Sequence, residues 1–173
     1  IVQAQADGVP TSEPNVPVYD VAGTLPGKFP VVLHYVDASG TRSLSQLPTA
    51  IDAWRMAPGL VTTDPDAGRY WFWFRLKNSG TYAKRALVSY SDTFLEQADF
   101  YILGEREQIY QRGGLQVPIF ERAITTRMAA ADVVVPPGET VDVYMASTSQ
   151  FSASFGTRID SPAGFASWVE LKS

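Results

Sequence analysis

The chain has 173 residues, with 18 acidic and 14 basic side chains and a net charge of −4 at pH 7. Hydrophobic residues make up 45% of it and charged residues 18%, a balance typical of a globular domain and not of a disordered segment. The absence of cysteine excludes disulfides, thiolate metal sites and cysteine nucleophiles. No more than two basic residues are adjacent, so we expect no nucleic-acid partner, because neutralising phosphates requires a basic stripe.

Residues 1–29 are polar and proline-bearing, and we expect them to form an N-terminal arm or linker with an edge strand at Val16–Val21. Residues 30–170 are expected to fold as a single domain, which is ordinary for a chain of this length. The first residue is isoleucine, which is typical of a sequence from which a signal peptide or membrane anchor has been removed. No apolar run approaches the roughly 18 residues that cross a bilayer, so any membrane attachment is expected through segments absent from this chain.

Strand and turn signals alternate along the rest of the chain. β-branched residues predict a strand at Val31–Val36. From Leu44 to Trp54 apolar residues recur every three or four positions, which predicts one short amphipathic helix. Thr62–Gly68 is predicted to be a polar loop. Further strands are predicted at Tyr70–Asn78, Ala86–Tyr90, Ala98–Leu103, Gln108–Arg112, Arg122–Met128, Asp132–Val135, Thr140–Ser147 and Phe151–Ile159.

The C-terminal segment predicts a second short helix, with Ser161 suited to its N-cap and Pro162 to its first position. Many short strands at intervals of roughly 8–12 residues predict an all-β fold, a jelly-roll-like antiparallel β-sandwich with one or two short helices. We interpret Gly113–Gly114 and Pro136–Gly138 as structural, because glycine permits positive φ and Pro-Pro-Gly sets a turn.

The stretch Tyr70–Asn78 is unusual because large apolar side chains fall on both faces of the predicted strand. A core requires only one such face. The other face, with two tryptophans and two cations, is typical of a surface that stacks on a ligand or packs beneath another layer. By the two-residue period, one face carries Tyr70, Phe72, Phe74 and Leu76, and the other carries Trp71, Trp73, Arg75 and Lys77.

The order and spacing of several motifs resemble the 7TMR-DISM extracellular domain 2 family over roughly residues 30–168. These motifs are Trp71–Asn78, Glu96–Leu103, Arg127, Val133–Gly138, Val141–Tyr144 and Phe165. The resemblance implies a jelly-roll sandwich similar to carbohydrate-binding modules. It also implies a periplasmic location, ahead of membrane helices that lead to a histidine kinase or a diguanylate cyclase, in two-component or cyclic di-GMP signalling. Positions that match residues recurring in the family pattern are Trp71, Asn78, Asp99, Tyr101 and Arg127, whereas Trp73 departs from it.

An aromatic face with nearby polar groups suits sugar binding, because the apolar face of a pyranose stacks on an indole while charged side chains fix its hydroxyls. Asp99 and Tyr101 share one face of their predicted strand. Our candidate ligand-binding residues are therefore Trp71, Trp73, Asp99, Tyr101 and Arg127. In the alternative interpretation, the two tryptophans are ordinary core beneath the N-terminal segment.

Two loops carry hard oxygen ligands of the kind that Ca²⁺ prefers. One offers Asp37 and Ser39, and the other Asp64 and Asp66, although these residue types are also common in turns. No other cofactor is expected. His34 is the only histidine, and the chain has no nucleophile elbow, zinc-binding helix motif or phosphate-binding glycine loop. We therefore expect no enzyme.

The sequence favours a periplasmic ligand-sensing domain of a membrane-bound receptor, binding a saccharide or another small molecule. The signal would be a population shift in the C-terminal exit near Trp168–Leu171. Three alternatives stay open. The domain could be a protein–protein or homodimerisation ectodomain without a small ligand, since interfaces also favour exposed Trp, Tyr and Arg; a calcium-responsive sensor; or a carbohydrate-binding module of a secreted enzyme.

Overall fold

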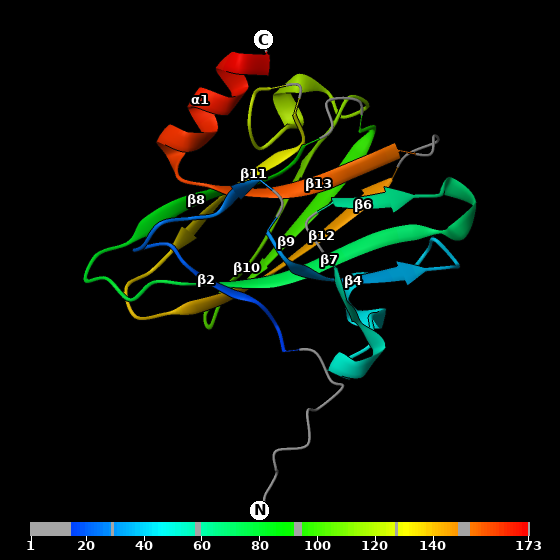
Figure 1. Cartoon of the computed structure of the whole chain (residues 1–173), viewed down its shortest axis with the longest axis horizontal. Helices are drawn as coiled ribbons and strands as arrows, with labels where there is room; N and C mark the ends of the chain where they lie inside the picture. The colour runs from blue at the N-terminus through cyan, green and yellow to red at the C-terminus, as the bar shows by residue number, and fades with distance from the viewer. Residues whose placement is uncertain are drawn as a thin grey trace, which may run out of the picture.

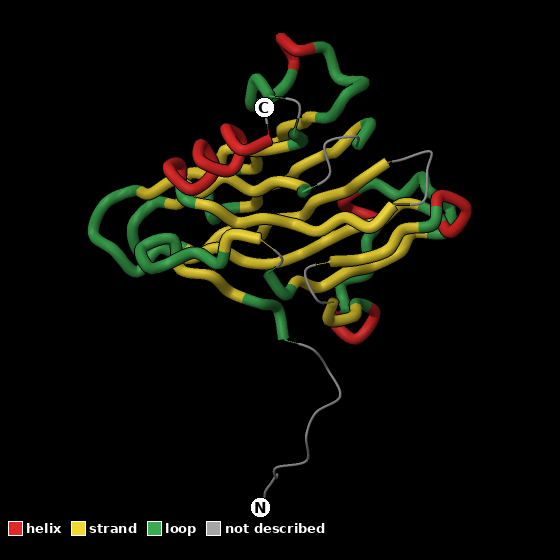
Figure 2. Tube along the Cα trace, turned by 45° about the horizontal axis from the view of Figure 1, so that its top comes forward, coloured by secondary structure: helices red, strands yellow, loops and turns green. Residues whose placement is uncertain are grey.

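The computed structural model describes residues 15–28, 30–57, 60–91, 95–126, 128–148 and 153–172. They form two β-sheets packed face to face, with one α-helix against the outside of the second sheet (Figures 1 and 2). This confirms the all-β sandwich predicted from the spacing of the strands. The strand expected at Val16–Val21 is present as β2 (Val18–Asp20), which pairs in parallel with the long strand β7.

The large sheet has seven strands and the small sheet five. Except for β2, the strand pairs are antiparallel. The large sheet runs β10 (Gln108–Gly113), β9 (Gln97–Leu103), β12 (Thr140–Thr148), β7 (Arg69–Lys77), β4 (Val32–Asp37) and β5 (Arg55–Ala57), with β2 beside β7. The small sheet runs β11 (Ala130–Val135), β8 (Lys84–Tyr90), β13 (Ala153–Asp160) and β3 (Gly27–Lys28), with β6 (Leu60–Thr63) beside β13.

Strand β7 divides its side chains as its sequence predicts. Phe72, Phe74 and Leu76 point between the sheets and are fully buried, and Tyr70 from the same face is buried with them. Trp71 and Trp73 point to the outer face of the large sheet, where they belong to a separate apolar cluster. Two clusters on opposite faces explain why this one strand carries large apolar side chains on both faces.

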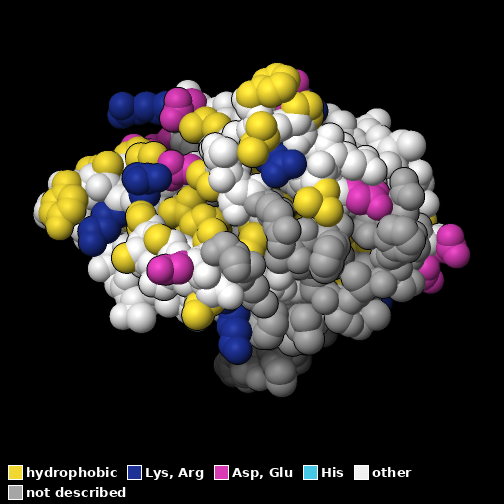
Figure 3. Space-filling model, turned by 90° about the horizontal axis from the view of Figure 1, so that it is seen from above, with side chains coloured by type: hydrophobic (Ala, Val, Ile, Leu, Met, Phe, Trp, Pro, Cys, Tyr) yellow, Lys and Arg dark blue, Asp and Glu magenta, His cyan; other side chains and the backbone are white. Residues whose placement is uncertain are grey.

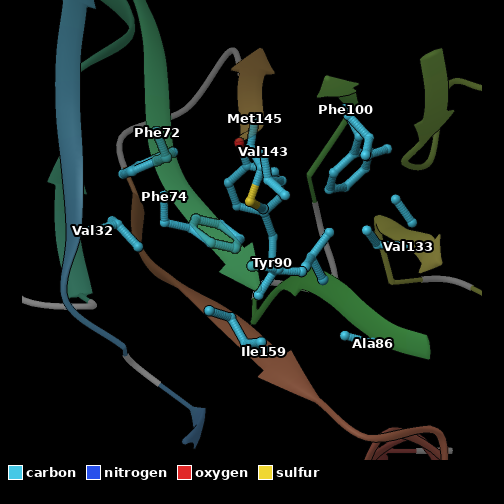
Figure 4. Close-up of a cluster of buried hydrophobic side chains, with 14 of the residues drawn as sticks. Val32, Phe72, Phe74, Ala86, Tyr90, Phe100, Val133, Val143, Met145 and Ile159 are labelled. Atoms are coloured by element: carbon cyan, nitrogen blue, oxygen red, sulfur yellow. The ribbon is translucent and has the colours of Figure 1, made fainter. Parts of the chain in front are cut away.

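The main core lies between the two sheets, where inward-pointing side chains interdigitate (Figure 4). The large sheet contributes Phe72, Phe74, Phe100, Val143 and Met145, among others. The small sheet contributes the aromatic Tyr90 and the smaller aliphatic residues Ala86, Val133 and Ile159, which fill the remaining space. Each fully buried aliphatic or aromatic side chain stabilises the fold by about 1.5–3 kcal/mol.

A side-chain clamp closes one edge of the sandwich. Gln111 of β10 points inward, donates through Nε2 to the carbonyl of Asp132 at 2.8 Å and accepts the amide N–H of Asp132 at 2.9 Å. The amide group of Gln111 therefore takes the place of a neighbouring strand at the free edge of β11. Such pairing protects an edge that would otherwise be open to another chain.

The single amphipathic helix predicted between Leu44 and Trp54 is wrong. The segment forms two short 3₁₀ turns, Leu44–Gln46 and Ile51–Ala53, with extended backbone between them. Pro48 explains the break, because a proline disfavours the helical conformation at the residue before it and lacks a backbone N–H to donate. The apolar spacing still buries side chains, since Leu47 and Trp54 both pack against the outer face of the large sheet.

The strand predicted at Arg122–Met128 is also wrong, because the described residues of this range form bends. The Arg122 guanidinium donates to the carbonyls of Val117 and Thr126, both at 2.8 Å, and curls the connection around itself. The polar loop predicted at Thr62–Gly68 begins two residues too early, because Thr62 and Thr63 belong to β6. For the last predicted strand, Phe151 and Ser152 lie outside the described residues, and β13 begins at Ala153.

The C-terminal helix α1 (Pro162–Lys172) is confirmed. Ser161 Oγ accepts the N–H of Gly164 at 3.1 Å, which is the predicted N-cap contact. Phe165 and Trp168 pack on the outside of the small sheet, and the Arg158 guanidinium lies 4.5 Å from the Trp168 ring centroid. Among the described residues, no helix has the length and apolar character needed to cross a membrane.

Candidate functional site

Strand register places four aromatic residues in one line across the outer face of the large sheet. Tyr110 pairs with Tyr101, Tyr101 with Tyr144, and Tyr144 with Trp73. The ring centroids of Tyr101 and Tyr110 are 5.1 Å apart, and those of Trp73 and Tyr144 are 5.2 Å apart with nearly parallel planes. We call these four residues the aromatic row. Its members come from four strands, β10, β9, β12 and β7.

One end of the aromatic row is covered and the other is open. The segment 44–54 lies over the covered end, where the Trp54 ring packs 5.3 Å from Trp73 and 6.0 Å from Tyr144. Trp54 Nε1 donates to the Pro48 carbonyl at 3.1 Å, which fixes the indole in place. Trp73 is only 6% exposed, whereas Tyr110 at the far end is 51% exposed. The part open to solvent is therefore built from tyrosines.

A buried carboxylate lies beside the open end. Asp99 is 3% exposed, forms an ion pair with Arg69, and accepts hydrogen bonds from the Tyr110 hydroxyl and from Gln97 Nε2. Ala146 pairs with Asp99 on one side and with Trp71 on the other, and its small side chain leaves space for Arg69 to cross the strand. We call Arg69, Gln97, Asp99 and Tyr110 the Asp99 cluster.

Trp71 is fully buried and is held on two sides. Its ring stacks on Tyr101 at 5.8 Å, and the Arg69 guanidinium lies 5.0 Å from its centroid. Trp71 Nε1 has no hydrogen-bond partner among the described residues. Trp71 thus supports Tyr101 and Arg69 from below and does not present an open face in this structure. Its role in binding stays a prediction.

A second polar group borders the aromatic row at Asp142. Trp73 Nε1 and Arg75 Nε both donate to Asp142 Oδ1 at 2.8 Å, and both Arg75 and Asp142 are partly exposed.

Burial, with a smaller contribution from the Asp142 charge, raises the pKa of Tyr144 to about 12. Burial and the hydrogen bond to Asp99 likewise raise the pKa of Tyr110. At neutral pH the tyrosines are therefore protonated donors.

A hollow of about 290 Å³ lies next to Arg69, lined by Ala38, Ser39, Gly40, Asp66, Gly68, Arg69, Ser147 and Thr148. Gly68 allows the two loops that form it to meet. Its φ is +126°, and an added Cβ would lie 2.0 Å from the Asp37 carbonyl oxygen. The hollow brings together two of the four predicted calcium ligands, Ser39 and Asp66.

The other two predicted calcium ligands are engaged within their own loops. Asp37 accepts from the Ser39 hydroxyl at 2.6 Å and from the Arg42 amide at 2.8 Å. Although burial opposes it, these bonds lower the pKa of Asp37. Asp64 accepts the Asp66 amide at 2.9 Å. Among the described residues no group of three or more His, Asp or Glu side chains could hold a metal ion, and calcium binding stays a prediction.

Of the predicted site residues, the structure brings Trp71, Trp73, Asp99 and Tyr101 together on one face of the large sheet. Arg127 lies outside the described residues. Sequence reasoning missed Arg69, Gln97, Tyr110, Asp142 and Tyr144. The signal available for two of them was alternation, because Tyr110 and Tyr144 lie within predicted strands, but only the register between strands places them beside Tyr101.

The comparisons with known proteins agree with this architecture. The family model described as 7TMR-DISM extracellular 2 matches residues 30–161, which is more than half of the chain. The matched range contains the aromatic row and the Asp99 cluster. Among curated proteins, none matches the chain.

Proposed function

Because the chain belongs to the 7TMR-DISM extracellular 2 family, we propose that it senses a carbohydrate-like ligand on the open part of the aromatic row. The family consists of extracytoplasmic sensor-type domains of membrane receptors, so this chain is an extracytoplasmic, periplasmic part of a membrane protein. The ligand class and the output of the receptor are the proposed elements.

The observation that carries the proposal is the pairing of open tyrosine rings with prepositioned polar groups. Tyr101 and Tyr110 offer ring surface beside the Asp99 cluster, and Tyr144 lies between them and the ion pair of Arg75 with Asp142. A pyranose ring presents one apolar face for stacking and a rim of hydroxyls for such donors and acceptors. The polar groups are already held by one another, so little ordering is needed when a ligand binds.

The proposed output is a histidine kinase or a diguanylate cyclase, as the resemblance of the sequence implies. Ligand binding would favour one of two arrangements of the domain, which requires that the ligand bind one arrangement more tightly than the other. Helix α1 packs on the outside of the small sheet through only a few large side chains, chiefly Phe165 and Trp168. It is therefore the element whose position such a change would alter.

Thermal shift and calorimetry with a panel of mono- and oligosaccharides, amino acids, carboxylic acids and chelator-controlled divalent cations test the proposal. A ligand at 100 times its dissociation constant contributes about 2.7 kcal/mol of stability. Tyr110→Ala should weaken a saccharide at least about tenfold. Tyr82→Ala, a matched control on a tyrosine that is 67% exposed outside the site, should leave binding unchanged.

Unchanged saccharide binding by a folded Tyr110→Ala variant would exclude the aromatic row as the site. A response to calcium alone would favour the calcium-responsive alternative. No response to any compound, together with concentration-dependent dimerisation that Arg75→Ala weakens, would favour the protein-interface alternative.

A further inference from the structure

An apolar projection stands out on the side of the molecule that carries α1. It lies on the connection from β10 to β11, which includes the 3₁₀ turn Ile119–Glu121. Phe120 is 84% exposed, Ile119 57% and Leu115 42%, and Leu171 in the last turn of α1 is 85% exposed. We call these four residues the apolar crest. Figure 3 views this side and shows hydrophobic side chains at its surface.

Hydrogen bonds and a buried side chain hold the backbone of the connection that carries Leu115, Ile119 and Phe120. The Leu115 amide donates to the Leu95 carbonyl at 2.9 Å, and the Arg122 side chain donates to carbonyls on both arms of the connection. Val117 points into the protein and is only 3% exposed. The backbone is thus fixed, and the fixed backbone holds Ile119 and Phe120 out in the solvent.

The base of the crest is joined to α1. Ile124 and Met128, from the same connection, pack with Phe165, Trp168 and Val169 of the helix. Figures 1 and 2 both show the connection and α1 at one end of the molecule. The connection and the helix therefore form one packed unit at this end of the molecule.

We propose that the apolar crest docks on a lipid surface. As part of a membrane protein, the domain is held near a bilayer, so a contact that is individually weak acts at a high effective concentration. Apolar side chains that project from a folded surface bury readily at the boundary between headgroups and acyl chains. The Arg112–Glu121 ion pair at the base balances its own charge, so the crest does not repel anionic lipid although the whole chain is acidic.

The alternative occupant, a second copy of the chain, fits the crest less well. A stable protein interface buries about 800 Å² on each partner. Three exposed side chains on the connection and one in the last turn of α1 offer much less than this area. A deformable bilayer accepts such a tip without a complementary partner surface.

Single-cysteine labelling tests the proposal cleanly, because the chain has no cysteine of its own. Phe120→Cys and the control Tyr82→Cys are labelled with a polarity-sensitive fluorophore. The protein is then tethered by a C-terminal histidine tag to vesicles of phosphatidylethanolamine, phosphatidylglycerol and a nickel-chelating lipid. We expect a blue shift at position 120 and quenching by spin-labelled acyl chains at least about threefold stronger than at position 82.

A second measurement, co-sedimentation with vesicles, uses the chain with Phe120 unchanged. The unlabelled, histidine-tagged chain should co-sediment with anionic vesicles that hold a limiting amount of the nickel-chelating lipid, and the double variant Ile119→Ser, Phe120→Ser should do so at least about fivefold less. Its melting temperature should be unchanged, because both side chains are exposed. Equal quenching at positions 120 and 82 would overturn the proposal. So would a blue shift at position 120 that grows with protein concentration in the absence of lipid, which would indicate a second copy instead. Neither result depends on the identity of the sensed ligand.

Discussion

Removing the positive charge from the Asp99 cluster should destabilise the domain strongly. The side chain of Asp99 is 5% exposed and that of Arg69 is 17% exposed, so the ion pair is largely desolvated. Arg69→Met keeps most of the buried volume but leaves the carboxylate without its cation. Breaking a buried pair on one side costs about 3–5 kcal/mol. Because Tyr110 and Gln97 still donate to the carboxylate, we expect a value near the lower end, about 3 kcal/mol.

Urea unfolding followed by tryptophan fluorescence measures this loss, and Trp71 lies close enough to Arg69 to report on the site. The corresponding fall in melting temperature is about 6–12 °C for a domain of this size. The matched control is Arg85→Met, since Arg85 forms a bidentate pair with Asp132 on the exposed surface. That variant should show little or no change, because solvent screens surface pairs.

A double-mutant cycle decides whether the cost arises from the pair itself. Asp99→Asn removes the charge on the other side, and the combined variant should lose less stability than the sum of the two single losses, by at least about 1 kcal/mol. Additive losses would refute the reasoning. A loss below about 1 kcal/mol for Arg69→Met would refute it as well, because the carboxylate would then be solvated by other means.

Three further predictions follow from other parts of the fold. Gly114→Ala should cost about 2–4 kcal/mol in unfolding experiments, because φ is +113° and the new Cβ would lie 2.5 Å from the Glu96 carbonyl oxygen. The control Gly138→Ala, with open space around it, should cost about 1 kcal/mol. Since the pKa of Tyr144 is raised from 10.0 to about 12, the stabilising contribution of the protonated Tyr144 hydroxyl should be complete below pH 10 and be lost as the pH rises through 12. In a titration of ultraviolet absorbance, Tyr144→Phe should remove one tyrosine that titrates at high pH. Gln111→Ala should cost about 1–2 kcal/mol and increase aggregation measured by light scattering, because it unpairs the backbone of Asp132 at the edge of β11.

The sandwich itself could be predicted because its signals are local. The two-residue period of Tyr70–Asn78 assigns the apolar side chains of β7 to the correct faces. The helix predicted from Leu44 to Trp54 was wrong because apolar spacings of three and four are not unique to a helix. They also occur in a segment with two short turns that packs its apolar side chains against a sheet. The proline at position 48 was the local signal against a helix.

The site was only partly predictable because it depends on strand register. Alternation alone places Asp99 and Tyr101 on one face. It does not show that Tyr101 lies between Tyr110 and Tyr144, since these pairings join strands far apart in the chain. Nor does it show that Arg69, 30 positions before Asp99, reaches across Ala146 to meet it. The cover over Trp73 is equally non-local, because it comes from Trp54.

Strand β10 connects the two proposals physically. Tyr110 lies in the middle of it, and the strand ends at Gly113, directly before the connection that carries the apolar crest. Arg112 of the same strand forms an ion pair with Glu121, and its carbonyl accepts the Ala123 amide at 3.0 Å. A ligand that moves Tyr110 therefore acts on the element that holds the crest. Coupling between two binding sites is reciprocal, so if the two sites are coupled, vesicles should change the affinity for the ligand by the same factor as the ligand changes binding to vesicles. Two independent sites would give a factor of one in both directions, with each proposal still standing on its own test.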